Sequence, residues 1–312
     1  MSRTLAILFP GQGSQTVGMG KALAQQFPVA ARIFAEADDA LGFGLSTLCF
    51  DGPEDALKLT ANAQPAILAT SIAALRVLEQ ETAVRPAYVA GHSLGEYSAL
   101  ITAGALTLAD ALRVVRERGR LMQEAVPVGV GAMAALFGLS AEEVAQVCAE
   151  AAQGEVVSPA NLNGGGQVVV AGHTGAVRRV VSVAKARGAK RAVELAVSAP
   201  FHCALMTPVA DELARVLEAI PVSPLGVGVI ANVTAEVNQD HWRVKDLLIQ
   251  QVTAPVRWEE SMQRLVALGC EAAVEVGPGR VLAGLLKRIA PELLCASVSD
   301  PATVAEARGV LA

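Results

Sequence analysis

The chain has 312 residues, of which 53% are hydrophobic and 18% charged, and this composition indicates a folded protein with a sizeable core. Its 25 basic and 30 acidic residues leave a net charge of −5, so we expect no overall attraction to nucleic acid or anionic lipid. Aromatic residues make up only 4%, which argues against a stacking surface for bases, and no apolar run reaches the ~20 residues of a membrane span.

The cysteines and the N-terminus bear on the compartment. Five scattered cysteines show no C-x-x-C spacing, so we expect buried thiols in a reducing cytoplasm and neither disulfides nor a metal site. Residues 1–4 lead into only five apolar residues before Gly11, which is not typical of a secretory signal.

In chain order, the first 127 residues alternate between short apolar strands and longer helices. Strands are predicted at residues 4–9 and 87–90, and helices at 19–26, 30–41, 65–78, 96–103 and 107–125. This alternation predicts a mostly parallel sheet with helices on both faces.

Residues 128–199 follow a different order. Strands are predicted at 131–137, 156–162, 167–171 and 190–197, and helices at 140–152 and 174–187. Ser140 and Glu143 form a capping box that opens the first of these helices. The order βαββαβ is typical of a ferredoxin-like unit, so we expect a small domain inserted into a large one.

After residue 200 the first pattern resumes. Helices are predicted at 205–219, 244–252 and 257–268, strands at 227–231 and 272–276, and a final helix from the Gly277-Pro278-Gly279 loop to Ile289. The expected fold is therefore α/β, with a large domain of residues 1–127 and 200–312 and a ferredoxin-like insert of residues 128–199.

Ser93 is the leading candidate for a nucleophile. It lies in Gly91-His92-Ser93-Leu94-Gly95, between a short β-rich run and an apolar helical run. On a tight strand-to-helix turn, a serine hydroxyl is exposed beside the N–H groups of a helix N-terminus. The alternative is an ordinary Gly-rich turn with a helix-capping serine.

A serine nucleophile needs a base, and the chain has four histidines. We favour His202, because it lies in Pro200-Phe201-His202, where the chain leaves the insert and clefts between domains form. A buried structural histidine is the alternative. No acidic residue is close to His202 in sequence, so a backbone carbonyl is left to hold the imidazole tautomer in a Ser-His dyad.

Acyl transfer also needs N–H donors for an oxyanion. Leu94, directly after the serine, and Gln12, in the loop after the first strand, are candidates. A plain turn is the alternative for Gly11-Gln12-Gly13. The G-x-G-x-x-G spacing fails at Thr16, so no dinucleotide cofactor is expected.

Arg118 lies on the helix that follows the serine unit. The charged run of residues 116–120 is typical of a solvated helix face, and that is the first reading of Arg118. The other is a buried guanidinium that pairs with a substrate carboxylate.

Taken together, these segments resemble the malonyl-CoA:acyl-carrier-protein transacylases of fatty-acid synthesis, over nearly the whole chain and in the family's order. The matching segments are Phe9-Pro10-Gly11-Gln12-Gly13-Ser14-Gln15, residues 91–99, the Arg118 helix, Pro200-Phe201-His202 and residues 274–279. The resemblance implies an α/β-hydrolase-like large domain with a ferredoxin-like insert.

The resemblance also implies roles. Ser93 matches the nucleophile, His202 the base, and Arg118 the arginine that pairs with the malonyl carboxylate. Gln12 and Leu94 match the backbone donors to the oxyanion.

Further matches concern the surroundings of these residues. Gln251 matches the residue whose carbonyl orients the histidine, and Asn161 and Asn163 resemble pocket residues between the domains. Phe201, beside the base, is expected to crowd a methyl branch on the acyl group. The family's Asn-Ser-Pro-Gly stretch is replaced here by Asn163-Gly164-Gly165-Gly166, which changes the contacts expected for pantetheine.

The implied partners are malonyl-CoA, as a substrate and not a cofactor, and an acidic acyl carrier protein that docks on a local basic patch. A cytoplasmic monomer without nucleic-acid or membrane partners is expected. Candidates for the patch are Arg178, Arg179, Lys185, Arg187, Lys190, Arg191, Lys287 and Arg288, for which a solvated helix face is the alternative. Three other functions stay open: a serine hydrolase, a non-catalytic docking subunit, and a malonyl transferase that serves malonate decarboxylation or polyketide synthesis.

Overall fold

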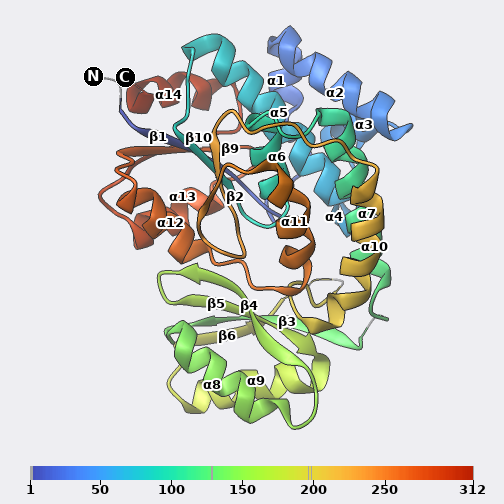
Figure 1. Cartoon of the computed structure of the whole chain (residues 1–312), viewed down its shortest axis with the longest axis vertical. Helices are drawn as coiled ribbons and strands as arrows, with labels where there is room; N and C mark the ends of the chain where they lie inside the picture. The colour runs from blue at the N-terminus through green and yellow to red at the C-terminus, as the bar shows by residue number, and fades with distance from the viewer. Residues whose placement is uncertain (1–2, 128, 196, 198, 312) are drawn as a thin grey trace.

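The computed structural model describes residues 3–127, 129–195, 197 and 199–311, and the strands of this part form two separate sheets (Figure 1). The larger sheet has the order β10-β9-β1-β2-β7-β8, in which only β7 and β8 pair antiparallel. Its strands are β1 (Leu5–Phe9), β2 (Tyr88–Gly91), β7 (Gly228–Ile230), β8 (Val237–Asn238), β9 (Ala272–Val276) and β10 (Leu294–Val298). The expected α/β class with a parallel sheet is confirmed.

Helices cover both faces of the larger sheet. Side chains alternate along β1, so Ile7 and Phe9 lie in a core with α2, α5 and α7, whereas Ala6 and Leu8 lie in a second core with α12 and α13. The helices of this part are α1 (Lys21–Gln26), α2 (Pro28–Leu41), α3 (Leu45–Asp51), α4 (Glu54–Lys58), α5 (Thr60–Thr82), α6 (Gly95–Thr102), α7 (Leu108–Glu124), α10 (Thr207–Glu218), α11 (Val244–Thr253), α12 (Trp258–Ala267), α13 (Val281–Ile289) and α14 (Pro301–Leu311).

The smaller sheet is antiparallel, with the order β4-β5-β3-β6. Its elements are β3 (Gly131–Phe137), α8 (Ala141–Ala152), β4 (Val157–Gly164), β5 (Gln167–His173), α9 (Thr174–Ala186) and β6 (Arg191–Glu194). This is the predicted βαββαβ order, and the capping box at Ser140 is present. The last strand was predicted over residues 190–197, and β6 ends earlier, at Glu194. Residue 196, within the predicted range, is outside the described residues.

Each face of the smaller sheet has a different neighbour. Met133 and Ala135 of β3 belong to the core of the large part, whereas Ala134 and Leu136 pack under α8 and α9, at the lower end of Figure 1. The backbone N–H of Val256 also donates to Ala160 of β4 at 2.9 Å, which ties the two parts together. The predicted boundary at residue 128 is outside the described residues, and the division at residues 128–199 stays a prediction.

Helix α5 begins earlier than predicted. The sequence predicts a helix over 65–78, yet the helix runs from Thr60 to Thr82 with Pro65 inside it. Proline has no N–H, so it cannot bond the carbonyl of Ala61 four residues before it. The Nη1 atom of Arg116 donates to that carbonyl instead, at 2.8 Å.

The predicted final helix, which corresponds to α13, is not the last element. Strand β10 and helix α14 follow it. β10 is an edge strand in which only Val298 is buried, so it lacks the continuous apolar run of a central strand. The short helices α3 and α4 were likewise not predicted.

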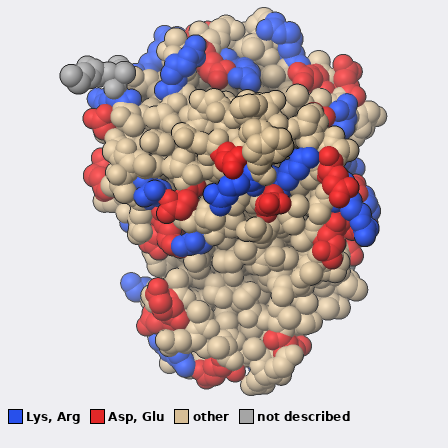
Figure 2. Space-filling view, viewed as in Figure 1, with Lys and Arg blue, Asp and Glu red and all other residues tan. Residues whose placement is uncertain are grey.

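The distribution of surface charge and the burial of the cysteines can be compared with what the composition predicts. Basic and acidic side chains are intermixed on the face shown in Figure 2, with no single sign of charge over it. All five cysteines are free thiols; four are buried, and Cys295 is half-buried. None of the helices in the described part has the length and apolar character that a membrane crossing requires.

Candidate active site

The candidate residues gather at the carboxyl end of the larger sheet. β1, β2 and β7 are parallel neighbours, so the loops that leave them meet at one edge. These loops carry Gln12, Ser93 and Asn232. A Cβ on Gly95 would lie 2.2 Å from the carbonyl oxygen of Phe9, so glycine is required for the two loops to pack this closely.

Ser93 occupies the predicted strand-to-helix turn between β2 and α6. Its φ of +50° is in the left-handed region, which a non-glycine residue seldom adopts. Two hydrogen bonds from Asn232 hold this turn: its Oδ1 accepts from the N–H of Ser93 at 2.7 Å, and its Nδ2 donates to the carbonyl of Gly91 at 2.7 Å. The strained backbone at the serine is thus held by a residue of the loop that follows the neighbouring strand β7.

Ser93 and His202 are brought together. The Oγ atom of Ser93 lies 2.8 Å from Nε2 of His202, and Nδ1 of the same ring lies 2.8 Å from the backbone carbonyl of Gln251. Because a carbonyl only accepts, Nδ1 carries the proton and the lone pair of Nε2 faces the serine. This is a dyad held by a carbonyl.

The environment of His202 keeps its ring neutral. Burial, and secondly the positive charge of Arg118, lowers the pKa of His202 to about 3. At neutral pH the ring can therefore accept the serine proton.

Arg118 is buried, with 1% of its surface exposed, so the solvated reading is wrong. Its Nη2 donates to Oγ of Ser93 at 3.1 Å and to Oε1 of Gln251 at 2.9 Å, and its Nη1 donates to Oε1 of Gln64 at 2.7 Å. Its Nε has no partner in the described part of the chain. A buried guanidinium held by neutral amides is suited to take a carboxylate from a ligand.

The position of Arg118 follows from helical spacing. It lies on the face of α7 that buries Val114, Val115 and Met122. Arg120 points to solvent on another face, where it pairs with Glu117 and Glu124.

Gln12 and Leu94 lie beside the serine turn. A Cβ on Gly11 would come within 2.6 Å of the carbonyl oxygen of His92, so the Gln12 loop packs directly against that turn. The side chain of Gln12 donates to Thr60 at 3.1 Å. The backbone N–H groups of Gln12 and Leu94 have no hydrogen-bond partner among the described residues, and the oxyanion role predicted for them stays a prediction.

The remaining predicted residues lie around this cluster. Oδ1 of Asn163 lies 2.9 Å from Nε2 of His92, whose ring packs 5.4 Å from that of Trp258. Asn161 bridges to Val256 through its backbone, and Phe201 is buried in the core. Their roles in a pocket stay predictions.

The turn after Asn163 is shorter than predicted. β4 runs through Asn163 to Gly164, with a register shift between Leu162 and Gly164, so the turn itself is Gly165-Gly166. Both of these glycines have positive φ values.

Three buried polar residues of the site were not predicted: Gln64, Glu96 and Asn232. Each is a polar side chain in or directly after an apolar run, and this position is the one feature of the sequence that could have indicated its burial. Their partners come from distant segments: Asn232 contacts a residue 139 positions away, so the contact depends on the order of strands in the sheet.

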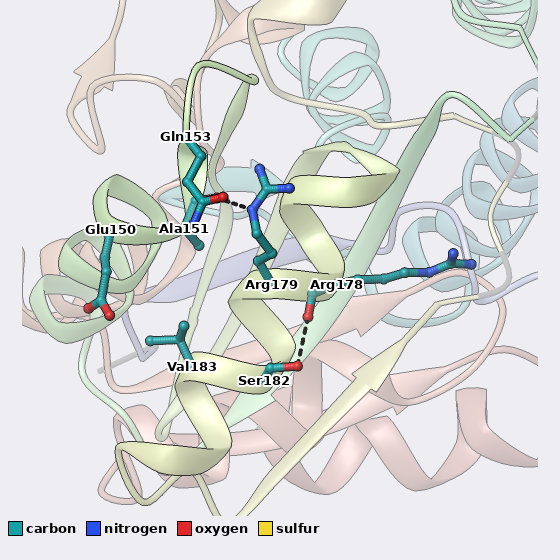
Figure 3. A pocket seen from close by; sticks show the side chains of 7 residues that line it. All are labelled: Glu150, Ala151, Gln153, Arg178, Arg179, Ser182 and Val183. Carbon is teal, nitrogen blue, oxygen red and sulfur yellow. Dashed lines mark hydrogen bonds between the residues drawn. The ribbon is translucent and has the colours of Figure 1, made fainter.

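A surface hollow of about 340 Å³ lies between α8 and α9, on the far face of the smaller sheet (Figure 3). Two arginines line it: Arg179 donates to the carbonyls of Ala151 and Ala152 at 2.7 and 2.8 Å, and Arg178 pairs with Glu194, so both already have partners inside the protein. Within the described residues, no group of three or more His, Cys, Asp and Glu side chains is placed to hold a metal ion.

The chain is similar to known proteins over nearly its whole length. The family model described as "Acyl transferase domain" matches residues 7–305. The chain is 49% identical to the malonyl CoA-acyl carrier protein transacylase of Escherichia coli strain K12 over 302 residues, 97% of this chain and 98% of that protein. The transacylase of Bacillus subtilis strain 168 is also 49% identical, over 96% of this chain and 95% of its own length.

Solved structures are equally similar. An acyl carrier protein S-malonyltransferase from Vibrio cholerae matches with a TM-score of 0.95 and 50% identity, over 97% of this chain and 99% of that one. A malonyl-transacylase in complex with a type II polyketide acyl-carrier protein matches with a TM-score of 0.95 and 48% identity, over 98% of each chain.

Proposed function

Because this chain belongs to the acyl transferase family that includes the malonyl CoA-acyl carrier protein transacylases, we propose that it moves a malonyl group from malonyl-CoA to the phosphopantetheine thiol of an acyl carrier protein. The chain is an acyltransferase. Beyond acyltransferase activity, the proposal specifies the two substrates and a covalent mechanism. It also specifies the pathway, in which the product supplies extender units for fatty-acid synthesis.

One observation carries the proposal: the hydroxyl of Ser93 is contacted by both a base and a buried cation. Nε2 of His202 lies 2.8 Å from Oγ, and Nη2 of Arg118 lies 3.1 Å from it. The base supports a serine nucleophile, and the cation supports an acyl group that ends in a carboxylate. A general esterase has no use for such a buried guanidinium.

In the first half-reaction, Oγ of Ser93 attacks the thioester carbonyl carbon of malonyl-CoA while its proton moves to Nε2 of His202. The oxyanion is stabilised by the backbone N–H groups of Gln12 and Leu94, each contributing about 3 kcal/mol by analogy with other oxyanion donors. The C–S bond then breaks, and the thiolate of coenzyme A leaves with the proton from His202. Ser93 is left as a malonyl ester.

In the second half-reaction, the carrier-protein thiol replaces coenzyme A. His202 removes the thiol proton, the sulfur attacks the ester carbonyl, and Oγ of Ser93 leaves with that proton. Arg118 pairs with the malonyl carboxylate throughout. The two substrates use one site in turn, which predicts ping-pong kinetics.

The contacts of the basic residues reduce the number of candidates for the surface on which the carrier protein docks. Arg178, Arg179 and Arg187 are paired with acidic side chains of the insert. Lys190 and Arg288 instead flank the Gly165-Gly166 turn, since a Cβ on Gly138 would meet Lys190 and one on Gly165 would meet Arg288, each at 2.8 Å. The N–H of Gly138 donates to Gly166 across this turn at 2.8 Å. The proposed docking surface is therefore Lys190 and Arg288, which flank the glycine turn. Lys287 instead lines a hollow with Cys295 and Ala296 of β10 and is not part of this surface. The proposal also includes that the protein works as a cytoplasmic monomer.

Two-substrate kinetics test the proposal. With malonyl-CoA and a holo carrier protein varied together, parallel double-reciprocal lines are expected, with little release of free malonate. Intersecting lines would contradict the covalent mechanism. If free malonate is released by hydrolysis as fast as the malonyl group is transferred, the protein is a hydrolase. If it transfers malonyl to polyketide carrier proteins and not to fatty-acid carrier proteins, the proposed pathway is wrong.

A further inference from the structure

Glu96 is a buried carboxyl group that the proposed mechanism does not use. It lies in the first turn of α6, three residues after Ser93, with 3% of its surface exposed. Its Oε2 atom accepts two hydrogen bonds, from Nε2 of Gln251 at 2.7 Å and from the backbone N–H of Asn232 at 3.1 Å. These two partners are also the residues that contact the serine turn.

Gln251 connects Glu96 to the reacting groups. Its Nε2 also donates to the carbonyl of Ser93 at 3.1 Å, its Oε1 accepts from Arg118, and its backbone carbonyl lies beside Nδ1 of His202. The side-chain amide has two ends of opposite character, so what it touches depends on which way it is turned.

The surroundings of this amide permit one orientation. As placed, its N–H₂ group faces two acceptors, Glu96 and the carbonyl of Ser93, and its oxygen faces the guanidinium of Arg118. The reversed amide would set oxygen against those acceptors and N–H₂ against N–H, and every one of these contacts would be repulsive. The acceptor at position 96, together with the carbonyl of Ser93, therefore favours the orientation in which the amide oxygen points at Arg118.

We propose that Glu96 is a positioning residue: its Oε2 atom fixes the side-chain amide of Gln251, so that the amide oxygen holds the guanidinium of Arg118 beside Ser93. The inference rests on the proposed function, because its consequence is selection of a carboxylated acyl group by Arg118. What Glu96 supplies is an acceptor at a defined point, and either charge state of the carboxyl leaves Oε2 able to accept.

Burial raises the pKa of Glu96 to about 7, against the opposing effects of its hydrogen bonds with Gln251 and Asn232 and of the charge of Arg118. The carboxyl is thus partly protonated near neutral pH. An acceptor role tolerates this, whereas a role as a permanent negative charge would not. The amide of glutamine should then be able to replace the carboxyl.

The test compares Glu96→Gln, which keeps an acceptor oxygen, with Glu96→Met, which keeps the volume and removes it. The readout is the ratio of Ser93 acylation rates with malonyl-CoA and with acetyl-CoA, measured by intact mass on one preparation. Unfolded molecules are not acylated, so they cancel from the ratio. Glu275→Gln is the matched control, because Glu275 is also buried and accepts from two backbone N–H groups, those of Leu282 and Ala283, away from Arg118.

We expect Glu96→Met to lower the malonyl-to-acetyl ratio by about tenfold or more, because the amide of Gln251 then loses its hydrogen bond with the charged guanidinium of Arg118. Glu96→Gln should stay within about threefold of wild type. Gln251→Met, which leaves Glu96 in place, should lower the ratio as much as Glu96→Met, and the double variant no further. Glu275→Gln should lower stability without changing the ratio.

A Glu96→Met ratio equal to that of wild type, with both rates falling together, would mean a merely structural role and overturn the inference. A Glu96→Gln ratio as low as that of Glu96→Met would overturn it as well, since charge would then matter and not the acceptor. Wild type that shows no preference for malonyl would instead overturn the proposed function, and this inference with it.

Discussion

The Nη2 atom of Arg118 lies 3.1 Å from the Oγ atom of Ser93, although Ser93 lies on the turn before α6 and Arg118 lies in α7. The guanidinium therefore reaches the same oxygen that faces His202. A carboxylate two carbons from a carbonyl attached to Ser93 would meet the cation with no large movement of the protein. In the proposed mechanism, this contact places the cation that selects the acyl group directly beside the nucleophile.

Replacing Arg118 tests that choice. Acetyl-CoA leaves a buried guanidinium without an anion, which costs about 3–5 kcal/mol and corresponds to discrimination of about 10²-fold or more. Arg118→Ala should therefore remove most of the preference for malonyl-CoA over acetyl-CoA in kcat/KM. Arg120→Ala is the control, because Arg120 is exposed and pairs with Glu117 and Glu124 of the same helix. An unchanged preference in Arg118→Ala would show that the carboxylate is bound elsewhere.

The acid side of the pH profile tests the state of His202. Its pKa is lowered to about 3, so the neutral ring is lost only as the pH falls through that value. Between pH 7 and 5.5 the rate of Ser93 acylation should change by less than about twofold. With an ordinary pKa of about 6.5, the neutral fraction of the imidazole, and with it the rate, would fall about eightfold.

Glu96 titrates in the same range, so the profile is also measured in Glu96→Gln. An eightfold fall of the rate in both wild type and Glu96→Gln would mean that His202 has an ordinary pKa and that its burial does not lower this pKa.

How far the sequence predicts this site depends on how local each signal is. The turn at Ser93 could be predicted because glycine spacing, strand and helix lie within one short stretch. Arg118 was ambiguous, because its charged neighbours are typical of a solvated face and only the packing of α7 shows which side it takes. Asn232 could not be predicted as a support of Ser93, because that contact depends on β7 lying next to β2.

The fold follows the same rule. β9 was predicted with its observed bounds because it is a central, fully buried strand, whereas β10 was missed because it is a partly exposed edge strand. The start of α5 was misplaced because the carbonyl freed by Pro65 is satisfied by Arg116, 55 residues from that carbonyl's own position in the chain.

The pH dependence of stability tests the environment of Glu96. Its folded pKa of about 7 lies above the ordinary 4.5, so the native protein holds a proton that the unfolded chain releases between these values. That contribution is fully present below pH 4.5 and is lost as the pH rises through 7. Glutamine does not titrate, so Glu96→Gln should gain about 2–3 kcal/mol relative to wild type between pH 5 and pH 8.

Urea unfolding of both proteins at the two pH values measures this difference. The contribution of His202 has the opposite sign, being lost as the pH falls below 6.5, but it is common to both proteins and cancels. A stability difference that does not change with pH would mean that the carboxyl of Glu96 keeps its ordinary pKa.

Charge reversal tests the docking surface. Lys190→Glu combined with Arg288→Glu should raise the KM for an acidic carrier protein by about tenfold, with less effect at high salt, and leave the KM for malonyl-CoA unchanged. Arg187→Glu is the control, since Arg187 is already paired with Glu150 on the outer helices of the insert. Equal effects of the two changes, or none, would place the carrier protein on another surface.

The most direct test of the central claim is the intact mass of the protein after brief mixing with malonyl-CoA. Wild type should gain one malonyl group, Ser93→Ala should gain none, and holo carrier protein should remove the group far faster than water does. No adduct on wild type, an adduct that persists in Ser93→Ala, or discharge by water as fast as by carrier protein would contradict the assignment of a Ser93 malonyl-enzyme.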